Sequence, residues 1–300
     1  MALRTVLCFC LLAACGDDDL TLIPDAAPAD SAVDAGVGPG DAAVDSAVDA
    51  GSERDSGAVD AGVDSGSDPS CSLSDDFEDP ATLGCWTEEN LEFADVEIAD
   101  GSLQISFRAE SPARNAWFGD DVGPALTQQV TGDFLVILEV DAHRVGAPDE
   151  APTGEFNSAG LLVRDPASTR PGNQNWVMWN VGRQGDSNCG TGPRSVAVGS
   201  EGKTTVDSRS TLCLNPGTAR GELALCRVGA SVRLLRNLDG DDGWAEYHAY
   251  ERADFPETVD VGVLANAWAT PPDLHAEFRR IEFSVPDGLE SCSAEALNAR

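Results

Sequence analysis

The stretch Ser158–Arg183 reads SAGLLVRDPASTRPGNQNWVMWNVGR, and it indicates how this chain folds. Apolar runs at its two ends flank a segment rich in Pro, Gly, Asn and Ser, which is typical of two strands joined by a loop. Side chains on a strand point alternately to opposite faces, so Trp176 and Asn180 share one face and Trp179 lies on the other. One tryptophan therefore points into a protein core and the other away from it.

The same alternation of apolar and polar residues recurs along the rest of the chain. It runs through Phe134–Val140, Leu223–Leu225, Val232–Leu234 and Val259–Val263. Such period-two runs, separated by Asp-Gly and Pro-Gly turns, predict about a dozen strands. We therefore expect one all-β domain over residues 71–293, either a sandwich or a barrel, with a tail at 294–300.

The N-terminus reads MALRTVLCFCLLAACGDDD and predicts export from the cytoplasm. Its apolar run is too short for a membrane span, which takes about 20 residues. The motif Leu12-Ala13-Ala14-Cys15 is similar to the bacterial lipobox, which implies removal of residues 1–14 and acylation of Cys15. An ordinary secretory signal with an incidental cysteine is the alternative. By resemblance to the sorting rules of Gram-negative lipoproteins, Gly16 after the cysteine favours the outer membrane.

Residues 15–70 are the predicted acylated cysteine and its linker. Positions 16–70 carry thirteen Asp, one Glu and one Arg, and no aromatic residue. Such a segment cannot bury enough apolar surface to offset its chain entropy, and its like charges extend it, so we expect a disordered tether. The whole chain has a formal net charge of −33, which argues against a nucleic-acid partner. This charge also repels anionic lipid headgroups, so the acyl chains on Cys15, and not charge, are expected to hold the protein at the membrane.

The cysteines fit an exported protein. Cys8 and Cys10 leave with the signal peptide, and six cysteines remain in the predicted domain. An even number in an exported domain predicts disulfides, and the lack of C-x-x-C spacing among them disfavours a structural zinc site. Many pairings are open. One hypothesis joins Cys71 with Cys292 across the domain ends, Cys189 with Cys213 around a Gly- and Ser-rich segment, and Cys85 with Cys226.

Several short motifs occur along the chain in an order that is typical of one superfamily of β-sandwich proteins. They are Asp75–Phe77 as an opening strand, Gly132–Phe134 before an apolar strand, Ala159–Arg164, Asn175–Val177, Arg236–Gly240 turning into Trp244, and Val261–Ala265 before Phe278–Phe283. This order resembles the concanavalin A-like lectin/glucanase superfamily. It is most similar to the bacterial jelly-roll domains that sit beside glycoside hydrolases such as β-xylosidases. The resemblance covers Asp75–Pro286 and implies a two-sheet antiparallel jelly-roll sandwich with a carbohydrate ligand.

Retaining glucanases of that superfamily carry E-x-D-x-x-E on one strand, which places three carboxylates on one sheet face. This chain has Glu139 and Asp141, but Arg144 stands where the third carboxylate must be. A retaining mechanism needs two carboxyls about 5 Å apart with separated pKa values, and Asp141 cannot fill both roles. The sequence contains no other familiar catalytic motif, and its histidines occur singly, at His143, His248 and His275. We therefore expect no enzyme activity.

Sugar recognition combines an aromatic ring stacked on a pyranose with planar hydrogen-bonding groups. The predicted ligand-binding set is Arg164, Trp176 or Trp179, Asn180, Arg183 and Trp268. The alternative is that both strand tryptophans are packed, the outer one under a loop. No cofactor is predicted. The cluster Asp239, Asp241 and Asp242 favours a hairpin turn over a calcium loop, while the superfamily resemblance leaves a calcium site elsewhere open.

These patterns lead to a first hypothesis about function. The chain is expected to be a lipid-anchored, non-catalytic, lectin-like module of the cell envelope at the outer membrane, with the membrane and a polysaccharide as partners. One alternative is a divergent glycoside hydrolase that acts through Asp141 or another acid. The other is an interaction or structural lipoprotein whose sandwich binds a protein.

Overall fold

The computed structural model describes residues 71–112, 123–154, 156–167, 175–183, 196–203, 208–214, 218–268 and 270–300, and for 196–203 and 208–214 it describes the course of the strands alone. The predicted signal peptide and linker lie outside these residues. Val63–Arg300 form one compact unit, which contains all of the described residues. Within the described part, no helix is long and apolar enough to cross a membrane.

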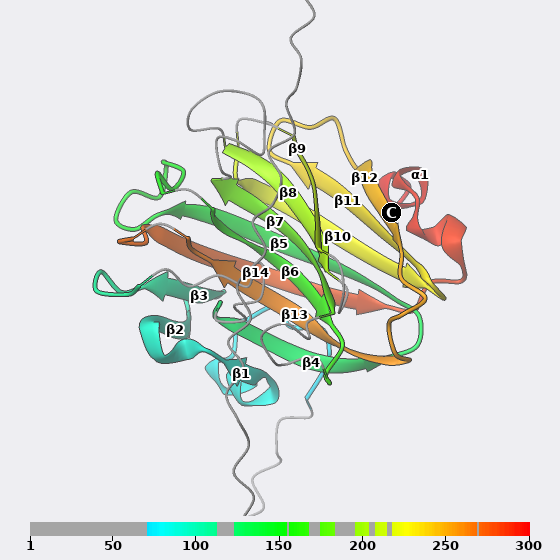
Figure 1. Cartoon of the computed structure of the whole chain (residues 1–300), viewed down its shortest axis with the longest axis horizontal. Coiled ribbons are helices and arrows are strands. Elements are labelled where there is room, and N and C mark those ends of the chain that lie inside the picture. Colours follow the sequence, from blue (N-terminus) through cyan, green and yellow to red (C-terminus); the bar gives the residue numbers. More distant parts are fainter. Residues whose placement is uncertain are drawn as a thin grey trace, which may run out of the picture. The chain divides into compact units, whose positions relative to one another are not determined.

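Two seven-stranded sheets make up the fold, and every pair of neighbouring strands is antiparallel (Figure 1). The first, called here the β6–β7 sheet, has the order β1 (Thr87–Glu89), β4 (Ala125–Thr131), β13 (Thr258–Asn266), β6 (Asn157–Arg164), β7 (Trp176–Arg183), β8 (Val196–Lys203), β9 (Ser208–Leu214). The second, the β5–β14 sheet, has the order β12 (Ala245–Glu251), β11 (Ser231–Leu238), β10 (Arg220–Val228), β5 (Phe134–Arg144), β14 (Leu274–Ser284), β3 (Ser102–Phe107), β2 (Ala94–Ala99). The predicted all-β antiparallel sandwich is confirmed.

The main core lies between the two sheets and is built from the alternating residues of the sequence patterns. Its members include Val136, Leu138 and Val140 of β5, Leu161 and Val163 of β6, and Val259, Val261 and Val263 of β13, each almost fully buried. Successive residues on a strand face opposite sides, so these apolar positions turn inward together while their neighbours face outward. The burial of this apolar surface is the main force that holds the two sheets together.

The C-terminal segment covers part of the outer face of the β5–β14 sheet. It contains the 3-10 helix η3 (Leu289–Cys292) and the short helix α1 (Ala294–Asn298), whose first turn is capped by the Ser293 side chain. Leu297 is buried in a second apolar cluster with Leu135 and Ile137 of β5 and with residues of β10 and β11. Residues 294–300, expected as a tail, thus contain a helix that packs on the sheet.

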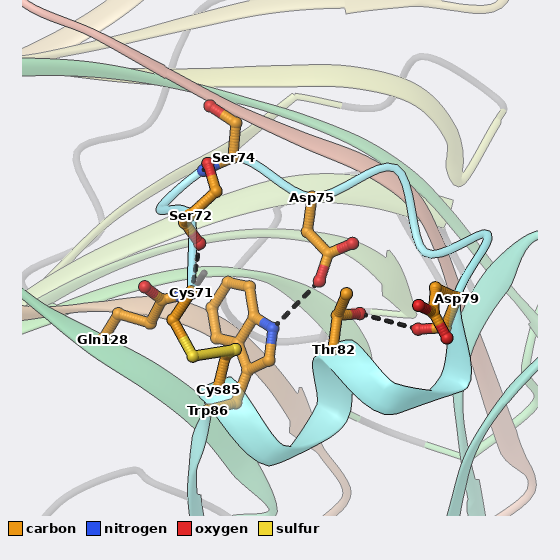
Figure 2. Close-up of a disulfide and its surroundings, with 9 residues drawn as sticks. All are labelled: Cys71, Ser72, Ser74, Asp75, Asp79, Thr82, Cys85, Trp86 and Gln128. Carbon is orange, nitrogen blue, oxygen red and sulfur yellow. Dashed lines mark hydrogen bonds between the residues drawn. A yellow bond between two sulfur atoms is a disulfide. The ribbon is translucent and has the colours of Figure 1, made fainter. Parts of the chain in front are cut away.

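Two further short helices, η1 (Pro80–Cys85) and η2 (Leu91–Phe93), precede the second strand. Cys85, the last residue of η1, forms a disulfide with Cys71, and the two Cα atoms are 5.4 Å apart (Figure 2). Trp86 packs beside this disulfide, and its indole N–H donates a hydrogen bond of 3.2 Å to Asp75. The expected opening strand at Asp75–Phe77 is reduced to a single bridge between Asp75 and Ile281.

The predicted disulfide pairing was wrong for the cysteines that the structure describes in full. Cys71 pairs with Cys85 instead of Cys292, and Cys226 of β10 pairs with Cys292 instead of Cys85. The reason is that η3 lies on the outer face of β10, which leaves the Cα atoms of Cys226 and Cys292 5.8 Å apart. The predicted Cys189–Cys213 pair is untested, because Cys189 lies outside the described residues.

Candidate functional site

The tryptophan that points into the core is Trp179. Its side chain is fully buried between the sheets, and its ring lies 4.4 Å from that of Tyr247, measured between centroids. The indole N–H donates a hydrogen bond of 2.9 Å to the carbonyl of Leu235 in the opposite sheet. Trp179 therefore packs and ties the two sheets together, and its ring has no face open to a ligand.

Trp176 and Asn180 lie on the outer face of the same strand, as the alternation predicts. Trp176 belongs to a small apolar cluster with Leu162 of β6 and Leu264 of β13, and it is 1% exposed. Asn180 is also buried, at 1% exposure. The structure thus agrees with the packed alternative for both tryptophans, since neither ring offers a face to solvent.

Arg164 lies directly across from Trp176 in the β6–β7 pairing and is 1% exposed. Its guanidinium donates two hydrogen bonds to the Glu89 carboxylate, one of them of 2.8 Å, and a third of 3.3 Å to Asp260. Burial raises the pKa of Asp260, and Arg164 opposes that rise. Arg164 is therefore buried and bound by two carboxylates of the protein, of which Glu89 is partly exposed, rather than held out toward a ligand. Arg183, at the end of β7, is buried as well.

Trp268 differs from the other members of the predicted set because it is 48% exposed. It follows the end of β13, and its ring meets that of Phe156 edge-on at 6.4 Å. Val145, just after β5, is an exposed apolar side chain in the connection that leads to β6. Since β13 pairs with β6 and β5 pairs with β14, these residues lie at the same end of the sandwich.

Asp273, between β13 and β14, fastens this end of the molecule. Its carboxylate accepts hydrogen bonds from the backbone and hydroxyl of Thr153, at 2.7 and 2.6 Å, and from Gly154 and Asn157. Burial alone would raise the pKa of Asp273, but these hydrogen bonds outweigh burial and lower the pKa below its ordinary value. An ionised Asp273 therefore holds the β5–β6 connection against the β13–β14 connection, next to Phe156 and Trp268.

A polar cleft of about 190 Å³ opens at the same end, beside the last residues of β5. Its walls include Asp141, His143, Glu150, Arg220 and Asp239. Asp141 is 5% exposed, and its carboxylate lies 2.8 Å from the Arg220 guanidinium. Burial raises the pKa of Asp141, but His143 and Arg220 outweigh it and hold the pKa below its ordinary value.

The glucanase-like positions of β5, Glu139, Asp141 and Arg144, do not present three carboxylates on one sheet face. Arg144, at the third position, pairs with Glu150 at 2.6 Å. Glu139 has Arg279 as its neighbour, at 3.7 Å. A general acid needs a raised pKa so that it keeps its proton near neutral pH, whereas the pKa of Asp141 is lowered. These contacts suit a charged binding surface better than acid–base catalysis.

Two histidines and a glutamate converge on the outer face of the β5–β14 sheet. His143 and His275 are directly opposite each other, and their ring centroids are 4.6 Å apart. The Nε2 atoms of His143 and His275 lie 3.9 and 3.6 Å from Glu277 Oε1. Burial and the nearby His143 lower the pKa of His275, which favours its neutral, ligand form. Among the described residues, these three could hold a metal ion.

One aspartate of the predicted hairpin turn, Asp241, is bound within the protein. The turn joins β11 to β12, and Asp241 accepts a hydrogen bond of 2.9 Å from the backbone of Leu238 while also pairing with Arg236. The predicted turn is therefore present, and Asp241 is the residue that closes it.

Sequence reasoning missed the grouping of His143, His275 and Glu277. A partial signal was present, because His275 and Glu277 are two residues apart on a strand and so share a face. The pairing of β5 with β14, which places His143 opposite them, joins distant parts of the chain and leaves no local pattern.

No family model and no curated protein matches this chain. Among solved structures, it is similar to a functionally unknown protein from Saccharomyces cerevisiae, with 17% identity and a TM-score of 0.51 over 69% of this chain and 99% of that one. It is also similar to the GH43 protein BlXynB from Bacillus licheniformis, with 11% identity and a TM-score of 0.53 over 71% of this chain and 39% of that one. A xylan β-1,4-xylosidase from Bacillus halodurans gives 13% identity and a TM-score of 0.50, with the same two coverages.

The chain thus spans about two fifths of the length of the two Bacillus proteins. At these identities the similarity concerns the fold alone. It bears out the expected likeness to a β-sandwich that forms part of β-xylosidase-type proteins.

Proposed function

We propose that this chain is a non-catalytic carbohydrate-binding protein of the cell envelope, with Trp268 as the platform on which a sugar ring stacks. The observation that carries the proposal is the exposure of Trp268, at 48%, on a rigidly fastened end of a lectin-like sandwich. Elsewhere among the described tryptophans, the indole rings are buried or partly buried.

The surroundings of Trp268 support a sugar rather than a purely apolar ligand. An indole face stacks on the C–H face of a pyranose, and neighbouring polar groups bind the hydroxyls and fix the orientation. Phe156 supports the indole edge-on, and the cleft at the same end offers charged groups from Asp141, Glu150 and Arg220. An aromatic platform at the same end of the domain as charged, hydrogen-bonding groups is a combination suited to polysaccharide recognition.

The pairing of the β5 carboxylates with cations supports a non-catalytic role over hydrolysis. Asp141 is bound by Arg220, and Arg144 occupies the position of the third glucanase carboxylate. A divergent hydrolase acting through Asp141 would need that carboxyl to hold a proton, and its lowered pKa opposes this.

The second part of the proposal is the location of the protein in the cell. The lipobox-like Leu12-Ala13-Ala14-Cys15 and the acidic segment that follows support acylation of Cys15 and a tether that holds the sandwich away from the membrane. Gly16 favours the outer membrane. The partners in this proposal are the membrane, through the lipid, and a polysaccharide, through the domain.

Replacing Trp268 by Ala tests the proposed site. We expect the full chain to bind a polysaccharide from a panel of xylan, plant glucans and peptidoglycan, measured by calorimetry with and without calcium. Loss of one stacked ring costs about 1 kcal/mol or more, so W268A should bind about fivefold or more weakly, whereas Trp268→Phe should keep part of the affinity.

Val285→Ala is the matched control, because Val285 is 82% exposed and lies outside the proposed site. It should bind like the original chain. The proposal fails if no glycan binds, or if W268A binds as tightly as V285A. Release of reducing sugar from the same panel would favour the hydrolase instead.

A further inference from the structure

We propose that His143, His275 and Glu277 form a site for one divalent transition metal ion, for which Zn²⁺ is the best match. The three side chains come from two adjacent strands, β5 and β14, and all point to the outer face of the sheet. One ligand atom from each lies within 4.8 Å of the other two. The site lies beside the polar cleft, since His143 lines both. Metal binding there would be a function in addition to the proposed sugar binding at Trp268.

The distances approach those that a tetrahedral ion requires. Zinc binds His nitrogen and carboxylate oxygen at about 2.0–2.2 Å, so ligand atoms around one ion lie about 3.3–3.6 Å apart. Here Glu277 Oε1 lies 3.6 Å from His275 Nε2 and 3.9 Å from His143 Nε2. The ligand nitrogens of the two histidines lie within 4.8 Å of each other. Closing the site around one ion therefore takes side-chain shifts of about 1 Å or less, and strands hold their side chains more firmly than loops do.

The other nitrogen of each histidine has a partner suited to orient it. His275 Nδ1 contacts the Ser106 hydroxyl, and His143 Nδ1 lies 3.5 Å from Asp141 Oδ1. Histidines that bind metals usually donate their second ring N–H to such a carboxylate or oxygen, which fixes the tautomer and the ring. His143 is 6% exposed, yet among the described atoms its Nδ1 forms no hydrogen bond within normal limits. Metal at Nε2 would place a proton on Nδ1, facing the Asp141 carboxylate.

The charges around the site limit its affinity without blocking it. Arg279 lies 3.2 Å from Glu277 Oε2, so it occupies the oxygen that the metal does not need. Arg220 neutralises Asp141 from the other side. The carboxylates of Glu277 and Asp141 balance these two cations, while the two imidazoles supply the remaining ligands. With three protein ligands, the ion keeps a position open to water or to another ligand, as in catalytic rather than structural zinc sites.

Titration of the chelator-treated full chain with Zn²⁺, with its disulfides formed, tests the proposal. Calorimetry should show one ion bound per chain with high affinity. Co²⁺ in its place should give the visible absorption of a tetrahedral ion without thiolate charge-transfer bands. Both Glu277→Gln and His275→Gln should weaken Zn²⁺ binding at least about tenfold, because each removes a ligand.

His248→Gln is the matched control, since His248 is the one other histidine of the chain and lies on β12, away from the site. Its affinity for Zn²⁺ should equal that of the original chain, and circular dichroism should show that all three variants are folded. The proposal is overturned if the original chain does not bind one Zn²⁺ per chain tightly. It is also overturned if E277Q and H275Q bind Zn²⁺ as tightly as the original chain, or if H248Q loses as much Zn²⁺ affinity as they do. W268A should keep Zn²⁺ binding, so failure of the sugar site and of the metal site can be told apart.

Discussion

Arg164 shows how one buried charge is stabilised in this fold. Its guanidinium is 1% exposed and meets Asp260 on the adjacent strand β13 and Glu89 on β1, which β4 and β13 separate from β6. A buried charge without a partner is far more costly than a buried charge in a complete ion cluster. The cluster joins β6 to both β1 and β13, so the free energy of unfolding should depend on it.

Replacing Arg164 by Met keeps much of the side-chain volume but leaves two carboxylates close together without their cation. We expect R164M to lower the free energy of unfolding by about 3–5 kcal/mol, measured by urea denaturation. Arg280→Met is the control, because Arg280 forms a half-exposed ion pair of 2.9 Å with Glu222. Its loss should cost about 1 kcal/mol or less, and equal effects of the two substitutions would contradict a structural role for Arg164.

For single residues, the sequence predicts only which face of a strand each side chain occupies, because side chains alternate along a strand. The opposite orientations of Trp176 and Trp179 follow from the sequence, and the structure confirms them. The burial of Trp176 does not follow, because it depends on the packing of separate strands. The same holds for the pairing of His143 with His275, which requires a contact between β5 and β14 that no local pattern encodes.

Strands β6 and β13 of the β6–β7 sheet each carry a glycine where a neighbouring strand comes unusually close. A Cβ atom on Gly160 would lie 2.1 Å from the carbonyl oxygen of Trp179, and one on Gly262 would lie 1.9 Å from that of Leu126. Both distances are shorter than any side chain tolerates, and the blocking atoms are backbone. The strand stretch Ala159–Arg164 therefore needs Gly160 for close approach to β7.

Gly160→Ala tests this requirement. It should lower the free energy of unfolding by about 1–3 kcal/mol, or more if β6 and β7 must separate, as measured by urea denaturation. Gly84→Ala is the matched control, because nothing lies within 4 Å of its missing Cβ. We expect G84A to change stability by about 0.5 kcal/mol or less. If G160A were as stable as G84A, the close approach would not be a constraint on the sheet.

At the scale of elements, the strands were predictable and their partners were not. Alternating apolar residues located β5, β6, β7 and β13, since each strand has one face in the main core. The disulfides depend on which elements meet, and the docking of η3 on β10 brought Cys292 to Cys226. Helix α1 is five residues long, too short to leave a helical period in the sequence, and it is held by packing and by its Ser293 cap.

The whole molecule has a charge that constrains how it can reach a membrane. With a formal net charge of −33, the chain is repelled by anionic lipid surfaces, so electrostatic adhesion cannot hold it there. The described sandwich offers no helix that could span a bilayer. Acyl chains on Cys15 are the attachment proposed above, and several acyl chains anchor firmly where a single one does not.

Labelling of growing cells with palmitate tests this attachment on the full chain. The original protein should take up label and stay in the membrane fraction through a high-salt wash, because salt removes only electrostatic attachment. Cys15→Ser should lose the label, since the proposed acylation site is gone, while Cys8→Ser should keep it, because Cys8 lies within the segment that is removed. Label on C15S, or none on the original chain, would contradict the anchor. The proposed sugar and metal sites would then belong to a protein with a different location in the cell.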